Sequence, residues 1–187
     1  HRVDGRQGQM CIGDRGDEAI RLTTILAAHE GALDPGGPVP ETCALLALMH
    51  LHAARAGARE DASGGLLLLE EQDRSLFDAA QIAAGLEWLE ASASGDAFSP
   101  YHAEAGIAAA HCLAATLSET RWAHVVEAHV PLLAVSPVHR LNHAVALAEW
   151  TGADPGLAAP PGFAPPTSPP RPAHWSASPP VLLRSSS

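Results

Sequence analysis

The sequence predicts an all-α fold of antiparallel helix pairs, arranged as a tetratricopeptide-like solenoid or a bundle. Apolar residues recur at helical spacing through most of residues 17–153, and a proline or a capping residue opens several of these runs. No stretch shows the alternation of a strand. The last two helix pairs also recur at close to the roughly 34-residue period of tetratricopeptide repeats, although the motif residues of that repeat are only loosely present.

Composition divides the 187 residues into three parts. Residues 1–16 are a polar, Gly-rich lead-in, expected to be partly disordered and to have the character of the middle of a longer polypeptide. Residues 17–153 are the helical domain of about six helices, and a chain of this size supports one core. Residues 154–187 are Pro-rich, contain no acidic residue beyond Asp154, and are predicted to be a disordered tail. A translation that slipped frame is an alternative origin of this tail, which the other two frames of the coding DNA would test.

The first helix is predicted from Asp17 to about Glu30, because apolar residues cluster there at helical spacing and Gly31 ends the run. Pro40 suits the first turn of a second helix that ends near Gly57. This second helix is apolar around so much of its circumference that it should be substantially buried.

The third helix is predicted from about Arg74 to Ala93, with Asp73 as its N-cap. A fourth is expected over 99–115, a fifth from 120 and a sixth over 136–152, with Ser-Pro pairs opening the fourth and the sixth. Pro131 should kink or end the fifth helix, because proline inside a helix removes a backbone hydrogen bond at a cost of roughly 3 kcal/mol.

Charge and cysteine content narrow the class of protein. The formal net charge is −10, and an acidic surface repels the phosphates that a free-standing DNA-binding domain must contact. The three cysteines lack the spacing of a zinc site or a disulfide framework, which favours a reducing cytoplasm, and Cys43 and Cys112 are expected in the core. No stretch approaches the roughly 18 apolar residues of a membrane-spanning helix, so no membrane contact is expected.

Eleven histidines prompt a search for metal-binding or catalytic residues. His139 and His143 have the i, i+4 spacing of helical zinc ligands, but no general-base glutamate lies between them, so surface or partly buried histidines are favoured. His50 and His52 should point to different sides of their helix. Neither a nucleophile elbow nor a Gly-rich phosphate loop occurs. We therefore expect no catalytic residue, no bound cofactor and no metal.

The segment 66–78, LLLLEEQDRSLFD, joins an apolar run to a dense group of charges, and we call it the junction. The adjacent glutamates at 70 and 71 are more typical of a capping and ion-pair cluster than of acid-base catalysis. We expect Asp73 to cap the third helix and Arg74 to pair with the acidic side chains. The leucines at 66–69 should pin the preceding loop to the core.

Segments 17–28, 41–59, 66–86 and 136–152 resemble, in order, the C-terminal extension of bacterial extracytoplasmic-function (ECF), sigma-24-like RNA polymerase sigma factors. That extension is a helical, tetratricopeptide-like domain. The most specific part of the resemblance is the junction, where the family pattern is close to L-x-L-L-E-D-Q-D-R-S-x-W-D. The chain supplies Leu68, Leu69, Glu70, Gln72, Asp73, Arg74, Ser75 and Asp78 of this pattern. Glu71 and Phe77 replace its usual Asp and Trp.

The resemblance implies a regulatory, protein-interaction domain of an alternative sigma factor, involved in transcription initiation and without catalytic activity. Its expected partners are the other sigma-factor regions, the RNA polymerase core, or both. The family's polymerase-binding and promoter-reading regions are absent from this chain, so DNA would be reached only through those regions. Two alternatives stay open: a free-standing tetratricopeptide-like scaffold that binds a protein or peptide outside transcription, and a metal-dependent enzyme that uses His139 and His143.

Overall fold

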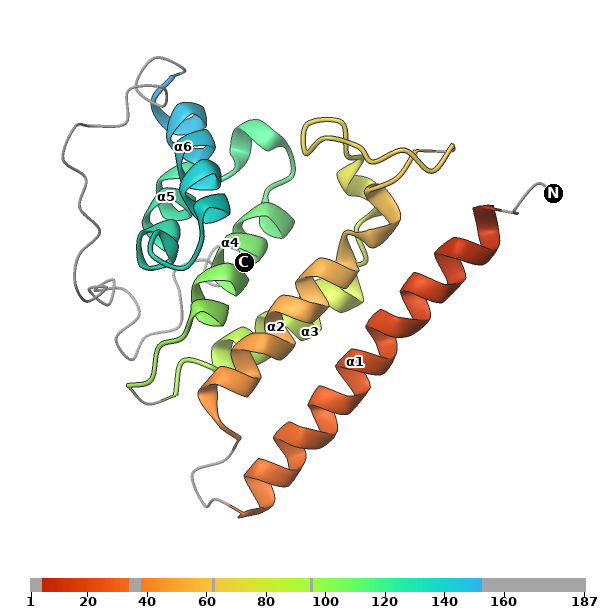
Figure 1. Ribbon diagram of the computed structural model, residues 1–187, viewed down its shortest axis with the longest axis vertical. Coiled ribbons are helices and arrows are strands. Elements are labelled where there is room, and N and C mark those ends of the chain that lie inside the picture. Colours follow the sequence, from red (N-terminus) through yellow and green to blue (C-terminus); the bar gives the residue numbers. More distant parts are fainter. Residues whose placement is uncertain (1–4, 34–37, 62, 95, 153–187) are drawn as a thin grey trace.

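The computed structural model describes residues 5–33, 38–61, 63–94 and 96–152, and over these residues the chain is all-α (Figure 1). Within this part of the chain six α-helices occur with four short 3-10 helices, and the only β-pairing is an isolated bridge between Glu60 and Leu66. The all-α prediction is therefore confirmed, whereas the tetratricopeptide-like solenoid stays a prediction. The tail predicted at 154–187 lies outside the described residues.

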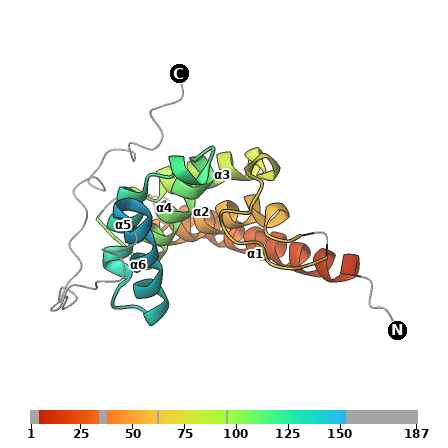
Figure 2. The same ribbon diagram turned by 90° about the horizontal axis from the view of Figure 1, so that it is seen from above.

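The helices lie roughly in chain order from one end of the molecule to the other. The α-helices are α1 (Gly5–Leu33), α2 (Pro40–Ala54), α3 (Ala79–Ala91), α4 (Pro100–Leu113), α5 (Trp122–His129) and α6 (Pro137–Thr151). The 3-10 helices are η1 (Ala56–Ala58), η2 (Arg74–Leu76), η3 (Leu117–Glu119) and η4 (Val130–Leu132). Helix α2 packs against α1, α3 and α4, and α5 packs against α4 and α6. Figure 2 shows the result, with α1 at one end and the α5–α6 pair at the other.

Helix α1 begins at Gly5, so it takes in most of the segment expected to be a polar lead-in. Once packing against α2 has nucleated such a helix, each further residue gains one backbone hydrogen bond, which lets the helix extend past Asp17. Ala27 is buried, whereas Leu22, Ile25 and Leu26 are each about half exposed. The apolar residues whose spacing predicted this helix therefore lie largely on its solvent-exposed face.

The main core lies where α2, α3 and α4 meet. The predicted burial of α2 is confirmed, and Leu46 and Leu51 are completely buried. Most of the side chains that α4 contributes to this core are small, which lets helices approach closely. The buried members of the cluster are Ala47, Leu48, Leu51, Leu89, Ala105, Ala108, Ala109 and Cys112. A second cluster joins α4 to α5 and α6 through Ala110, Val125, Val126 and Ala146.

Gly85 fixes the closest approach of α3 to α2. A Cβ atom placed on Gly85 would lie 2.7 Å from the Cγ atom of Leu51 and 3.2 Å from the carbonyl oxygen of Ala47. Alanine normally stabilises a helix by about 1 kcal/mol relative to glycine, but overpacking costs about 1–3 kcal/mol. We expect Gly85→Ala to lower the free energy of unfolding measured with urea. An added Cβ at the exposed Gly16 meets no described side chain or neighbouring element within 4 Å. Gly16→Ala is therefore the control, and a gain in stability at both glycines would contradict the close approach.

Local start and stop signals place the last three helices. Ser99 and His102 form a reciprocal capping box at the start of α4, and Pro137 occupies the first turn of α6. Helix α5 ends at His129, and residues 130–132 continue as the 3-10 helix η4 around Pro131. The predicted effect of Pro131 is confirmed.

The third helix begins later than predicted. Residues 74–76 form the 3-10 helix η2, Phe77 is extended, and α3 starts at Ala79. Asp73 caps η2 by accepting a hydrogen bond from the Ser75 amide. Asp73 is therefore the cap of a shorter helix, and the prediction that it caps the third α-helix is wrong, because the sequence holds a second capping residue at Asp78.

Asp78 is the N-cap of α3. Its carboxylate accepts hydrogen bonds from the amides of Ala80, at 2.8 Å, and Gln81, at 3.1 Å. Loss of such a cap costs about 1 kcal/mol, so we expect Asp78→Ala to lower the free energy of unfolding by about that amount while Asp78→Asn loses less. Urea unfolding of the two variants would check this, and equal losses for both would contradict the capping role.

Candidate functional site

The junction is held by hydrogen bonds between its own residues. The Glu71 carboxylate accepts from the Leu68 amide at 2.7 Å, and the Asp73 carboxylate accepts from the Ser75 hydroxyl at 2.6 Å. The hydroxyl and the amide of Ser75 lower the pKa of Asp73. The two carboxylates therefore accept hydrogen bonds that hold the local backbone, and their role is structural.

The four leucines that open the junction do not pin it to the core as predicted. Leu66 is 84% exposed and Leu68 is 62% exposed, while Leu67 and Leu69 are partly buried. The backbone makes the attachment instead, because the Leu67 amide donates to the carbonyl of Arg59 at 2.9 Å. The prediction failed because burial alternates along this stretch, so that only Leu67 and Leu69 turn inward and Leu66 and Leu68 face solvent.

Arg74 joins the junction to the end of α4. Its Nη1 atom donates to the carbonyl oxygens of His111, at 2.6 Å, and Ala114, at 2.8 Å. Carbonyls at a helix C-terminus have no partner within the helix, and a cation there also suits the helix dipole. Within the described residues Arg74 binds these carbonyls and forms no ion pair with an acidic side chain. The prediction that it pairs with the acids is therefore wrong.

Phe77 lies between two arginines. The guanidinium carbons of Arg55 and Arg74 are each 5.9 Å from the centre of its ring, a distance at which a ring attracts a cation. Arg55 also donates from Nη2 to the Gln72 side-chain oxygen at 3.0 Å. Of the junction residues singled out from the sequence, the structure thus brings Gln72, Arg74 and Phe77 together around Arg55. Glu70 and Ser75 stay on the exposed side.

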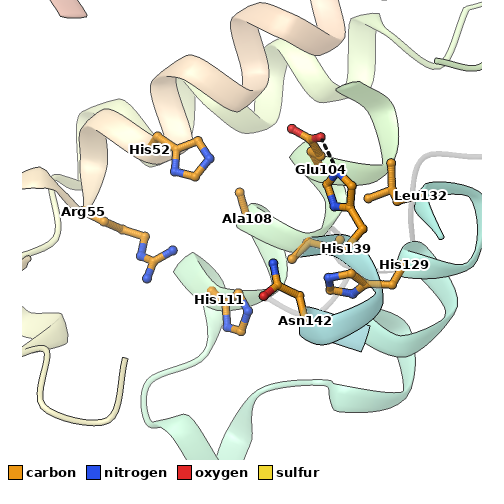
Figure 3. Close-up of a pocket in the computed structure, with 10 residues that line it drawn as sticks. His52, Arg55, Glu104, Ala108, His111, His129, Leu132, His139 and Asn142 are labelled. Carbon is orange, nitrogen blue, oxygen red and sulfur yellow. Dashed lines mark ion pairs between the residues drawn. The ribbon is translucent and has the colours of Figure 1, made fainter. Parts of the chain in front are cut away.

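Arg55 faces a pocket of about 190 Å³ between α2, α4 and the α5–α6 pair (Figure 3). Figure 3 shows His52, Arg55, His111 and Asn142 pointing toward one space, while Glu104 and His139 close one side of it. The Nε2 atom of His139 is 3.5 Å from the Glu104 carboxylate. The full lining is His52, Arg55, Glu104, Ile107, Ala108, His111, His129, Leu132, His139 and Asn142. No pocket was predicted from the sequence.

Burial lowers the pKa of three imidazoles that line this pocket. Burial, then Arg55 and Arg74, lower the pKa of His111 to about 4. Burial, then Arg59 and Arg55, lower the pKa of His52, and burial lowers the pKa of His129. At pH 7 the fixed positive charge of Arg55 therefore lies among the uncharged rings of His52, His111 and His129.

The histidine pairs noted in the sequence separate in space. His139 lies against Glu104 of α4, whereas the ring of His143 lies 6.3 Å from that of His129. Across the described residues, no group of three or more His, Cys, Asp or Glu side chains is placed to hold a metal ion. His50 accepts or donates at Gln81, with 2.7 Å between the atoms, while His52 lines the pocket, which confirms that they point to different sides.

Cys43 and Cys112 are buried free thiols, as predicted for core residues. In the described part of the chain, no helix has the length and apolar character needed to cross a membrane.

Comparison with known proteins identifies a related segment. Residues 6–93 match the model of a family described as a family of unknown function, DUF6596. The DUF6596 match takes in α1, α2, the junction and α3. It therefore contains the α2 wall of the pocket and ends before the α4, α5 and α6 walls.

One curated relative extends the similarity beyond the DUF6596 match. An uncharacterized protein of Rhizobium meliloti (strain 1021) is 38% identical over 144 residues, which are 76% of this chain and 33% of the relative. The chain thus spans about a third of the length of that relative. No solved structure matches the chain.

Proposed function

We propose that this chain is a regulatory, protein-interaction domain of an ECF-type alternative sigma factor and acts in the bacterial cytoplasm during transcription initiation. The observation that carries the proposal is the junction sequence, whose residues resemble the pattern of the sigma-factor extension. The similarity to one third of a longer protein agrees with a domain that works beside other regions. The chain itself would perform no catalysis and would reach DNA only through those other regions.

Exposed apolar faces at both ends of the molecule support a role in protein contact. On α1, Leu22, Ile25 and Leu26 are about half exposed. On α6, Val138, Leu141 and Val145 are each more than half exposed at helical spacing. We call these two sets the α1 face and the α6 face. Contiguous exposed apolar residues typically mark protein interaction surfaces.

A binding experiment tests the proposal. The 187-residue chain would be mixed with RNA polymerase core and, separately, with the polymerase-binding and promoter-reading regions of a sigma factor from the same genome. We expect saturable binding to at least one of them by a pull-down with purified components. Binding to neither would reject the proposal and leave the free-standing scaffold as the better account.

Paired variants would locate the contact. Leu22→Glu with Ile25→Glu places charge on the α1 face, and Val138→Glu with Leu141→Glu does so on the α6 face. The matched controls are Thr24→Glu and Arg140→Glu, which change exposed positions of the same helices. We expect one charged face to abolish binding while its control binds as wild type. Unchanged binding in both charged variants would contradict a role for these faces.

A further inference from the structure

Arg55 is a buried cation without a counterion in the described part of the chain. Arg55 is 7% exposed. Its guanidinium stays charged at any physiological pH. Such a charge is costly to bury unless it is paired. Its electrostatic neighbours Arg59 and Arg74 are positive as well. The nearby Cys112 thiol cannot balance it, because burial raises the pKa of that thiol to about 11.

Glu104 is the carboxylate that lines the same pocket, and it lies beside His139. Figure 3 shows it on the far side of the pocket from Arg55. Arg55 instead donates a hydrogen bond to the uncharged side chain of Gln72 and contacts the Phe77 ring. Neither of these two contacts supplies a negative charge to balance the guanidinium.

Two buried polar atoms at this place have no hydrogen-bond partner. They are Nε of Arg55 and Nδ1 of His111, and His111 is 9% exposed. Buried donors and acceptors are nearly always satisfied in proteins, so unpaired ones indicate a missing partner. Both residues line the pocket, and Asn142 lines it as well (Figure 3). A guanidinium, an imidazole and an amide thus line one pocket, and the guanidinium and the imidazole each keep an unpaired buried nitrogen.

The cavity can hold a small ligand. Its volume of about 190 Å³ is several times the roughly 30 Å³ that one water occupies in the liquid. A planar guanidinium matches the two oxygens of a carboxylate. A single buried arginine suits an anion with one charge, and the Glu104 carboxylate on the opposite wall disfavours an anion with two.

We propose that the pocket lined by Arg55, His111 and Asn142 binds a monocarboxylate. The carboxylate oxygens accept from the Arg55 guanidinium and the Asn142 amide, and the uncharged His111 ring lines the site beside them. The carboxylate belongs either to a small free acid or to an acidic side chain of a peptide. This inference is independent of the proposed function, because it rests on the pocket alone.

Titration of the full chain with sodium propionate tests the proposal. The readouts are the imidazole NMR resonances of His111 and the melting temperature, each compared with sodium chloride at equal ionic strength. We expect saturable movement of the His111 resonances and a rise in melting temperature with propionate beyond that with chloride. Identical behaviour in the two salts would overturn the proposal. Tighter binding of inorganic phosphate than of propionate would overturn the assignment to a monoanion.

Two variants keep the test specific. Arg55→Lys preserves the charge and loses the planar fork, so we expect it to weaken propionate binding roughly tenfold. Asn142→Ala removes an exposed amide and is expected to weaken binding roughly threefold while leaving the fold intact. The control, His29→Gln, changes an exposed residue of α1 and should bind as wild type. Wild-type affinity in both pocket variants would overturn the proposal even if propionate binds elsewhere.

A peptide comparison identifies the source of the carboxylate. An N-acetylated, C-amidated alanine pentapeptide with a central glutamate is titrated beside the same peptide with glutamine. Tighter binding of the glutamate peptide than of propionate assigns the pocket to an acidic side chain of a partner, and weaker binding assigns it to a small acid. Saturable binding of equal strength by the glutamate and glutamine peptides at the His111 resonances would contradict carboxylate recognition.

Discussion

Arg74→Met is expected to lower the free energy of unfolding by about 2–4 kcal/mol, because a hydrogen bond from a charged donor contributes about 1.5–3 kcal/mol. The guanidinium of Arg74 donates two such bonds, to the carbonyls of His111 and Ala114. Methionine fills a similar space and supplies no donor, so both carbonyls at the end of α4 lose this partner. Part of the loss is offset because burying methionine carries no desolvation penalty, whereas burying a guanidinium does. Urea unfolding at pH 7 measures the difference.

Arg140→Met is the matched control, because it makes the same chemical change at an exposed position of α6. We expect it to unfold at nearly the wild-type urea concentration. Arg74→Lys should recover part of the loss, since an ammonium can donate to carbonyls near a helix end but reaches them with a different geometry. Equal stability of Arg74→Met and Arg140→Met would show that the two hydrogen bonds contribute nothing.

Acid is expected to destabilise the protein between about pH 6.5 and pH 4, mainly through His111. The pKa of His111 is lowered from 6.5 to about 4 in the folded chain. In this window the unfolded chain binds the proton and the folded chain does not, so the free energy of unfolding falls as the pH falls. A shift of this size corresponds to about 3 kcal/mol at the acid end of the window. Urea unfolding at several pH values measures the slope.

The variant His111→Gln isolates this contribution. It removes the titrating ring, so we expect a smaller loss of stability between pH 6.5 and pH 4, whatever its stability at pH 7. Some slope should remain, because the pKa values of His52, His129 and His143 are lowered as well. His29→Gln, at an exposed position, should keep the full slope. A full slope in His111→Gln would contradict the assignment.

Signals that act over a few residues predicted much of the fold. The Ser-Pro starts of α4 and α6 and the break at Pro131 depend on backbone geometry at single positions, and the structure follows them. The start of α3 was misplaced because Asp73 and Asp78 are both good caps, five positions apart. The extended conformation of Phe77 decides between them. In that conformation the Phe77 ring lies between Arg55 and Arg74. No signal from neighbouring residues in the sequence predicts this contact.

The pocket could not be predicted from the sequence for a different reason. Arg55, His111 and Asn142 belong to three separate parts of the chain, and only the packing of α4 between α2 and α6 brings them to one cavity. Arg55 follows an apolar helix in the sequence, but a cation at a helix end can lie in solvent or be buried. The sequence does not show that its neighbours would be positive or neutral.

The contact of Arg74 with α4 also determines how the molecule opens. The Nη1 atom of Arg74 donates to two carbonyls at the end of α4. The backbone amide of Asp78 donates to the carbonyl of Ala54 at the end of α2. The junction therefore closes the last turns of two helices that belong to different parts of the sequence. Fraying of either helix end requires the loop to detach, so these three segments open as one cooperative unit.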